Sequence, residues 1–158
     1  MQLNSFPVLF ARQATLIVML IVMLLLGSDL AWGETSPVGL WRTIDDVTGK
    51  TMSTVRIADK DGVLSGWIDS IFEPEPNWDG RCVKCRDHRR NQPIVGMMIL
   101  SNLRKVGDDY AGGEILDPEN GKIYGCILRV VEEGRRLEVR GFIGISLFGR
   151  TQVWVREK

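Results

Sequence analysis

Apolar and polar residues alternate in short runs along most of the chain. In residues 137–143, Leu137 and Val139 alternate with Glu138 and Arg140. This two-residue period is that of a β-strand, whose successive side chains point to opposite faces of a sheet. The runs are rich in β-branched and aromatic residues, and none of them shows the 3.6-residue period of an amphipathic helix. The pattern therefore predicts an all-β protein.

Short segments rich in Asp, Asn and Gly separate these runs, and such residues favour tight reversals of the chain. They are residues 45–50, 59–62, 107–109, 117–121 and 132–134. Strands are expected at 39–45, 52–58, 63–71, 94–100, 103–106, 110–116, 122–131, 136–143 and 150–156. If the fourth and fifth form one bent strand, about eight strands remain, which is typical of an antiparallel sandwich or a small up-and-down barrel.

The beginning of the chain has a different pattern. Arg12 is the only charged residue before Asp29, and residues 14–26 are apolar except for Thr15. This run is short for a spanning helix but fits the core of a signal peptide. Small residues before the end of the segment predict cleavage after Gly33.

Residues 1–33 are therefore expected to be removed, which leaves residues 34–158 as a single domain. This predicts a periplasmic or otherwise exported protein with no transmembrane anchor after processing. An uncleaved anchor is the alternative. Since no Cys follows the apolar run at a lipid-attachment position, we do not expect a lipoprotein.

Composition excludes several functions. The 158 residues include 20 Lys+Arg and 20 Asp+Glu, so the net charge is zero and argues against nucleic-acid binding. His88 is the only histidine, which argues against multi-histidine metal sites and histidine-based catalysis. No nucleophile elbow, phosphate-binding loop or dinucleotide fingerprint is present. We therefore expect no enzyme activity, no cofactor and no metal.

The longest irregular stretch is residues 72–93, and a loop of this length in a compact domain is often functional. Its second part is strongly basic. A site for anionic headgroups or for an envelope protein is one interpretation, and a solvated loop neutralised by its acidic neighbours is the other. The basic residues of this candidate patch are Arg81, Lys84, Arg86, Arg89 and Arg90.

Three cysteines in an exported chain predict one disulfide and one remaining thiol. A bond between Cys82 and Cys85, with Cys126 buried on a strand, is the simplest arrangement. A bond from either loop cysteine to Cys126 is the alternative. A redox-active Cys-x-x-Cys beside basic residues, and a zinc site that adds His88, are two further interpretations.

A wider set of residues carries a family resemblance. The set is Gly39, Leu40, Trp41, Thr43, Asp45, Asp46, Gly49, Lys50, 55–57, Cys82, Cys85, Pro93, Ile94, Gly96, 115–122, Tyr124, Cys126, 137–147, 149–152 and Trp154. In these residues the chain resembles a bacterial family of exported proteins, domain-of-unknown-function family 2147. The resemblance implies a lipocalin-like β-barrel in the cell envelope, and it implies no particular reaction or ligand.

Gly39 and Trp41 also resemble the Gly-x-Trp of lipocalins, where the indole lies across the closed end of the barrel under a basic residue of the last strand. In an up-and-down barrel the last strand runs antiparallel beside the first, so its carboxyl end lies near the start of strand one. Arg156 is therefore the first candidate for the basic partner and Arg150 the second. Stacking of guanidinium on indole contributes about 0.5–2 kcal/mol.

Two functions remain as candidates. The first is binding of a small apolar or amphipathic ligand in a lipocalin-like barrel, because a barrel of this size either packs its interior or holds one small ligand. The second is interaction with an envelope partner through residues 72–93. The aromatic residues that could line a ligand site are Trp67, Tyr110, Tyr124, Phe142 and Trp154.

Overall fold

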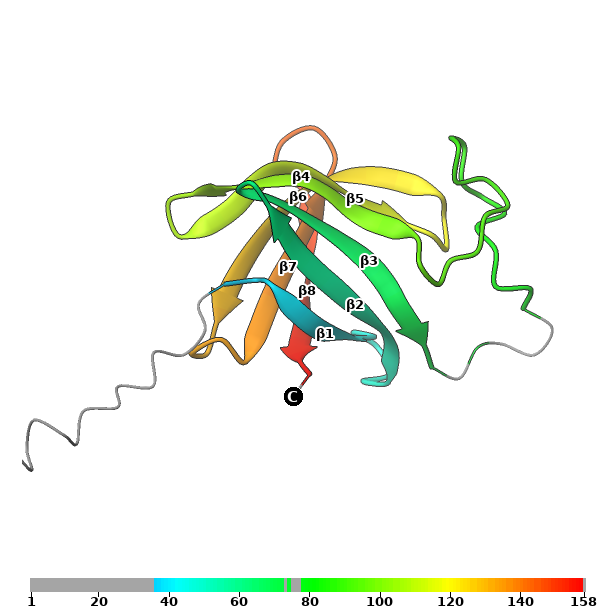
Figure 1. Cartoon of the computed structure of the whole chain (residues 1–158), viewed down its shortest axis with the longest axis horizontal. Helices are drawn as coiled ribbons and strands as arrows, with labels where there is room; N and C mark the ends of the chain where they lie inside the picture. The colour runs from blue at the N-terminus through cyan, green and yellow to red at the C-terminus, as the bar shows by residue number, and fades with distance from the viewer. Residues whose placement is uncertain (1–35, 73, 75–77, 158) are drawn as a thin grey trace, which may run out of the picture. The chain divides into compact units, whose positions relative to one another are not determined.

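The computed structural model describes residues 36–72, 74 and 78–157. Eight antiparallel strands form a closed barrel (Figure 1). The strands are β1 (Gly39–Ile44), β2 (Thr51–Lys60), β3 (Val63–Ile71), β4 (Met98–Val106), β5 (Asp109–Asp117), β6 (Lys122–Val131), β7 (Arg136–Phe142) and β8 (Gly149–Arg156). The expected signal peptide and its cleavage after Gly33 lie outside the described residues.

Each strand pairs with its neighbour along the chain, and β8 closes the barrel by pairing with β1. The closing pairs are Trp41 with Arg156 and Arg42 with Val155. Neighbouring strands are joined by short turns, except for the long connection between β3 and β4. The predicted all-β, up-and-down, eight-stranded barrel is thus confirmed. Over the described residues, no helix is long and apolar enough to cross a membrane.

The fourth and fifth predicted segments form one strand, β4, which bends at Asn102. Asn102 has φ of 60°, a conformation that Asn tolerates better than most residues. The expected strand start at residue 94 is wrong. The amide of Met97 bonds back to the carbonyl of Ile94, and Gly96 has φ of 84°, so the chain turns there instead of extending.

Side chains that point into the barrel form one packed core. Along β7, Leu137 and Val139 are buried while Glu138 and Arg140 are half-buried, as their alternation predicts. The largest buried side chains include Trp41 and Trp154. Residues of the β3–β4 connection join the same core, namely Cys82, Cys85, Ile94 and Met97.

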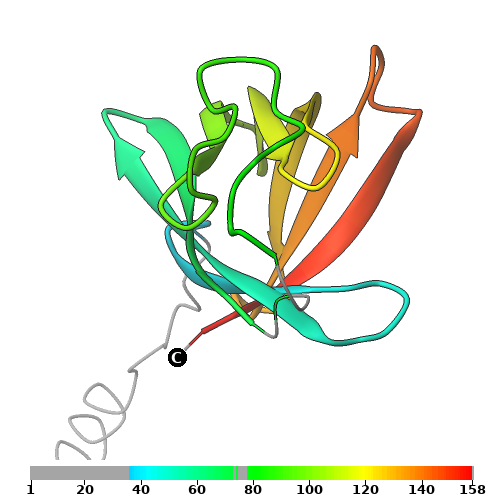
Figure 2. The ribbon, with the colours of Figure 1, turned by 90° about the vertical axis from the view of Figure 1, so that its right-hand side faces the viewer.

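The two ends of the barrel differ in what covers them. We call the end that holds the start of β1 and the end of β8 the closed end; it also carries the β2–β3, β4–β5 and β6–β7 turns. The opposite, open end carries the β1–β2, β5–β6 and β7–β8 turns and the β3–β4 connection. Figure 2 looks toward the open end, with residues 78–97 in green lying across it. We call residues 78–97 the disulfide loop.

Candidate functional site

Trp41 and Arg156 seal the closed end. The Trp41 side chain is fully buried, and its indole Nε1 donates to the carbonyl of Pro37 at 2.7 Å. The Arg156 guanidinium lies over the indole, with Cζ 4.2 Å from the ring centroid. Arg156 also donates to three carbonyls, those of Ser36 (2.7 Å), Val38 (2.9 Å) and Gly134 (2.6 Å). One side chain therefore ties the first strand, the last strand and the β6–β7 turn together.

Gly39 is required at this end by geometry. Its φ is +136°, which side chains rarely adopt, and a Cβ there would lie 2.7 Å from Nη1 of Arg156. The spacing Gly39-x-Trp41 therefore has a physical origin. The glycine makes room for the arginine that covers the tryptophan.

Arg150 is not part of this seal. It lies at the opposite end of β8 and forms an ion pair with Asp46 at 2.6 Å. The Arg150 side chain is 65% exposed. Arg150 as a second candidate for the closing residue is therefore wrong. The antiparallel direction of β8 separates its two arginines by the length of the strand, and only Arg156 reaches the start of β1.

A disulfide joins Cys82 and Cys85, and Cys126 is the remaining thiol. The alternative bond to Cys126 is thus excluded, and a zinc site that needs the thiolates of Cys82 and Cys85 is excluded in the same way. No group of three His, Cys, Asp or Glu side chains suited to a metal is found among the residues that the structure describes. Burial raises the pKa of the Cys126 thiol to about 12, which makes it a poor nucleophile.

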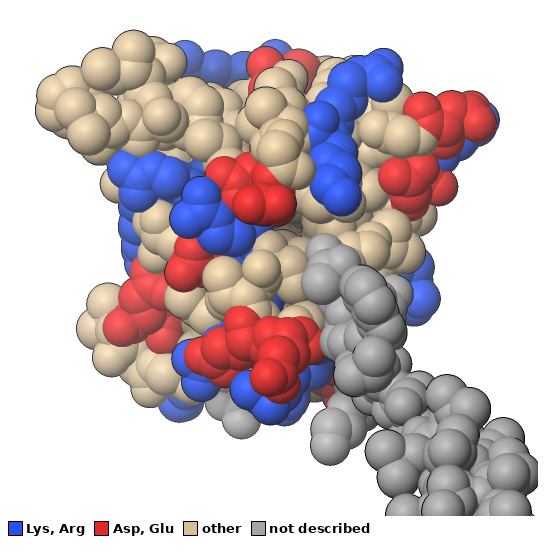
Figure 3. Space-filling model, turned by 90° about the vertical axis from the view of Figure 1, so that its left-hand side faces the viewer, with Lys and Arg blue, Asp and Glu red and all other residues tan. Residues whose placement is uncertain are grey.

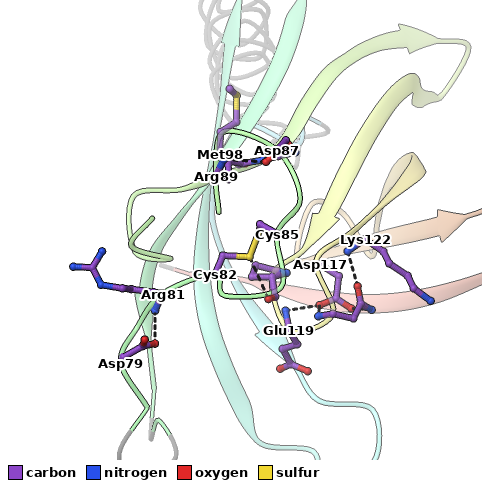
Figure 4. Close-up of a disulfide and its surroundings, with 12 residues drawn as sticks. Asp79, Arg81, Cys82, Cys85, Asp87, Arg89, Met98, Asp117, Glu119 and Lys122 are labelled. Carbon is purple, nitrogen blue, oxygen red and sulfur yellow. Dashed lines mark hydrogen bonds and ion pairs between the residues drawn. A yellow bond between two sulfur atoms is a disulfide. The ribbon is translucent and has the colours of Figure 1, made fainter. Parts of the chain in front are cut away.

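The disulfide holds its loop against the β5–β6 turn, as Figure 4 shows. Cys82 Sγ lies 3.4 Å from the carbonyl oxygen of Pro118, and both half-cystines are buried. A Cβ on Gly121 would collide with the backbone carbonyl of Lys84, so this contact needs glycine. The disulfide loop is therefore packed onto the open end rather than extended into solvent.

A groove of about 430 Å³ opens beside this contact. We call it the amphipathic groove, because its lining combines two cations with several apolar side chains. It is lined by Arg86, Asp87, Leu116, Gly121, Lys122, Ile123 and Ile143. These residues come from the disulfide loop, the β5–β6 turn with its flanking strands and the β7–β8 turn.

The acidic residue of the groove is already neutralised. Asp87 pairs with Arg89 at 2.5 Å, and hydrogen bonds from the Arg89 side chain and backbone lower the pKa of Asp87 to about 2. In the described part of the chain, neither Arg86 nor Lys122 takes part in an ion pair. The net charge available to a ligand in the groove is therefore positive.

The basic residues of the disulfide loop make different contacts and do not all line one groove. Arg81 donates to the carbonyl of Asn91 at 2.8 Å, and Arg89 donates to the carbonyl of Met98 at 3.1 Å. In Figure 4 these two side chains lie on different sides of the loop. Of these basic residues, only Arg86 lines the amphipathic groove, while Lys84 and Arg90 are exposed outside it.

A second groove has a volume of about 620 Å³. It is lined by His88, Met97 and Ser101 among others. Its lining residues come from the disulfide loop, β3 and β4. Among the described residues that line it, Arg89 is the only Lys or Arg. Because Arg89 is paired with Asp87, this groove offers a ligand less positive charge than the amphipathic groove does.

Three of the five candidate aromatic residues contact the interior. Trp154 is buried, Tyr110 packs against the core, and Tyr124 lies on the face of Cys126. Trp67 and Phe142 are on the outer face and do not line the interior. The reason is strand register, because each sits one residue away from a position on the inner face.

The alternation is visible around both outward residues. Leu64 and Ile68 are buried while Trp67 is half-buried on the opposite face. The Phe142 ring covers Gly125, where a Cβ would lie 2.6 Å from the ring. Phe142 therefore shields the backbone of β6 from outside the barrel.

Sequence reasoning missed two features of the open end. The first is the amphipathic groove, whose residues Leu116, Ile123 and Ile143 come from separate segments, so no local pattern indicates that they meet. The second is the β7–β8 turn, residues 143–148, whose uncharged and apolar composition is a usable signal of an exposed binding segment.

Comparisons with known proteins agree with this architecture. The family described as "Uncharacterized protein conserved in bacteria (DUF2147)" matches residues 39–156. The chain belongs to the DUF2147 family. No curated protein matches the chain.

A solved structure shares the fold of this DUF2147 protein. It is protein HP1028 from the human pathogen Helicobacter pylori, which is described as belonging to the lipocalin family. The TM-score is 0.67 at 23% sequence identity, over 78% of this chain and 84% of the other. This likeness shows a lipocalin-like fold for the DUF2147 chain.

Proposed function

We propose that this DUF2147 protein is an exported binding protein that holds a small amphipathic anion at the open end of its barrel, without catalysing a reaction. One observation carries the proposal: the amphipathic groove places the cations Arg86 and Lys122 beside the apolar side chains of Leu116, Ile123 and Ile143. Such a lining suits a ligand with an acidic head and a short apolar tail.

The size of the groove supports this choice. Its volume of about 430 Å³ falls in the range of roughly 300–1,000 Å³ that is usual for small-molecule sites. Side chains such as those of Trp41, Trp154 and Leu128 are buried in the barrel interior. We therefore propose that the ligand binds outside the barrel interior, in the groove beside the contact between the disulfide loop and the β5–β6 turn.

Export is part of the same proposal. It is supported by the signal-peptide pattern of residues 1–33 and by the Cys82–Cys85 disulfide, because disulfides persist in oxidising compartments. A periplasmic or otherwise exported location would also bring the protein near amphipathic envelope molecules.

Native mass spectrometry of protein purified after export tests whether a ligand is carried. A mass excess that disappears on denaturation supports the proposal and provides the ligand for identification. The head group is then tested by titration with dodecanoate and with dodecylamine, which differ in charge at the same chain length. We expect dodecanoate to bind more tightly.

The matched variants are Lys122→Gln in the groove and Arg90→Gln in the disulfide loop but outside the groove. Losing one of two cations should weaken dodecanoate binding by about tenfold, the effect of ~1.4 kcal/mol. Arg90→Gln should leave binding unchanged. Equal binding of both amphiphiles, or equal loss in both variants, would contradict a groove that recognises an acidic head.

The exposure of Lys84, Arg86 and Arg90 favours a second candidate function, in which an anionic envelope partner binds the basic loop. Its test is charge reversal at Arg86, Arg89 and Arg90, followed by pull-down from envelope extracts. If the charge-reversed protein recovers the same partners as the native protein, this second function is contradicted.

A further inference from the structure

The β7–β8 turn is the most exposed apolar segment of the open end. Residues 143–148 read Ile-Gly-Ile-Ser-Leu-Phe and carry no charge. Ile143, Ile145, Leu147 and Phe148 are between 60% and 75% exposed. Single exposed apolar residues are common on protein surfaces, but four within six residues mark an interaction site.

Part of the backbone of this turn is already hydrogen-bonded at its apolar tip. Arg140 donates from Nε to the carbonyl of Ser146 at 2.8 Å and from Nη2 to the carbonyl of Leu147 at 3.2 Å. The amide of Phe148 donates to the carbonyl of Ile145 at 3.2 Å. Because unpaired polar groups are costly to bury in an apolar medium, these bonds lower the cost of burying the tip.

Cations lie around the base of the turn. Arg140 contacts it directly, and Arg86 and Lys122 line the amphipathic groove together with Ile143. The ion pairs of the described residues include none made by these three cations. Figure 3, which views the side opposite to that of Figure 2, shows a projecting corner of uncharged residues at the upper left.

We propose that the protein docks on an anionic lipid bilayer through the β7–β8 turn. Ile145, Leu147 and Phe148 enter the boundary between headgroups and acyl chains, while Arg86 and Lys122 face the lipid phosphates. An apolar tip with cations at its base is the arrangement that binds such interfaces. A protein partner would not require that positive rim. This docking goes beyond the proposed function, since it needs no ligand in the groove.

Binding to vesicles tests the proposal with the full chain. Vesicles of phosphatidylcholine with and without phosphatidylglycerol are mixed with the protein, and the bound fraction is measured by flotation. The variant is Leu147→Asp with Phe148→Asp, and the control is Val106→Asp, another exposed apolar residue but at the closed end. We expect the double variant to bind anionic vesicles at least about tenfold more weakly, and the control to bind normally.

A local probe separates the turn from other lipid contacts, including any made by the apolar run of residues 14–26. An environment-sensitive dye is attached at Ser146→Cys and, in a second protein, at Lys60→Cys, where β2 ends at the closed end. Attachment is done without reductant, so the Cys82–Cys85 bond remains and the buried Cys126 does not react. The Ser146 dye should shift to shorter wavelength with anionic vesicles, and the Lys60 dye should not.

Three results would overturn the docking proposal: no binding to anionic vesicles, binding that the Asp variant leaves intact, or a Ser146 dye that does not respond. None of these bears on dodecanoate binding in the groove. Conversely, a native protein that binds anionic vesicles normally but does not bind dodecanoate would contradict the proposed function and leave the docking proposal intact.

Discussion

The closed and open ends of this barrel use cationic and apolar side chains in opposite ways. At the closed end, Arg156 makes internal contacts, because it stacks on Trp41 and bonds three carbonyls. At the open end, Arg86 and Lys122 line a groove, and the apolar residues of the β7–β8 turn face solvent. The closed end therefore holds the fold together, while the open end keeps its charge and apolar surface available for binding.

This difference has an energetic side. Contacts that are buried and fully hydrogen-bonded contribute to global stability, whereas binding segments are drawn from regions of low local stability. The barrel tolerates exposed apolar residues at one end because the contacts at the other end close it.

The largest difference in stability loss between the two ends should come from truncating one aromatic residue at each end. Trp41→Ala removes a fully buried side chain and the platform for Arg156, and we expect it to lower the unfolding free energy by about 3–5 kcal/mol. Phe148→Ala, in the exposed turn, should change it by less than about 0.5 kcal/mol. Urea unfolding of both variants measures this, and similar losses would erase the distinction between the ends.

The next largest difference in stability loss is expected between the two arginines of β8, Arg156 and Arg150. Arg156→Gln removes the stacking and three charged hydrogen bonds, so a loss of about 2–4 kcal/mol is expected. Arg150→Gln breaks an exposed pair with Asp46 and should cost less than about 1 kcal/mol. Thermal and urea unfolding check the ranking; an Arg150 loss as large as that of Arg156 would show that the open end is also a structural seal.

Removing the disulfide should affect the open end locally. In the chain-entropy model, a bond between Cys82 and Cys85 contributes about 2 kcal/mol. For Cys82→Ser with Cys85→Ser we expect faster amide hydrogen exchange in residues 81–97, and weaker dodecanoate binding, with exchange near Trp41 unchanged. Uniformly faster exchange would show that the loop and the closed end unfold as one unit.

At neutral pH, the smallest expected effect on stability is that of the Cys126 thiol. Its pKa is raised from 9.0 to about 12 by burial, so the neutral form is favoured in the folded protein. The associated stability is fully present below pH 9 and is lost as the pH rises from 9 toward 12. Cys126→Ala should therefore lose less stability than the native chain over that interval, as pH-dependent urea unfolding would show.

The same burial predicts slow alkylation of Cys126 at about pH 8 in the native state and rapid alkylation in urea. Rapid alkylation of the folded protein would mean that the barrel interior opens readily, which is the behaviour expected of the open end alone.

Local patterns were enough for much of the fold. Alternation at residues 137–143 and the Asp- and Gly-rich turns predict the strands, and the Gly39-x-Trp41 spacing leads to Arg156. The close spacing of Cys82 and Cys85 indicates a disulfide, which is present. The strand and disulfide signals work because the residues involved are near neighbours or follow the two-residue period of a strand, whereas the pairing of Trp41 with Arg156 follows from the resemblance to lipocalins.

Other features depend on tertiary structure. The sequence suggests Trp67 and Phe142 as ligand-lining residues, but both face outward, because a one-residue change of register moves a side chain through the sheet. The amphipathic groove joins three segments distant in sequence, and the Arg150–Asp46 pair joins residues at opposite ends of the domain sequence.

The sequence by itself thus predicted the strands and their turns from periodicity and local chemistry, while the resemblance to lipocalins indicated the closing residues and the disulfide pairing stayed one of several alternatives. Only the tertiary structure decided which side chains face inward and which cations remain available at the open end. Those outcomes follow from closure of the barrel, which brings distant turns together and assigns each strand face to the core or to solvent.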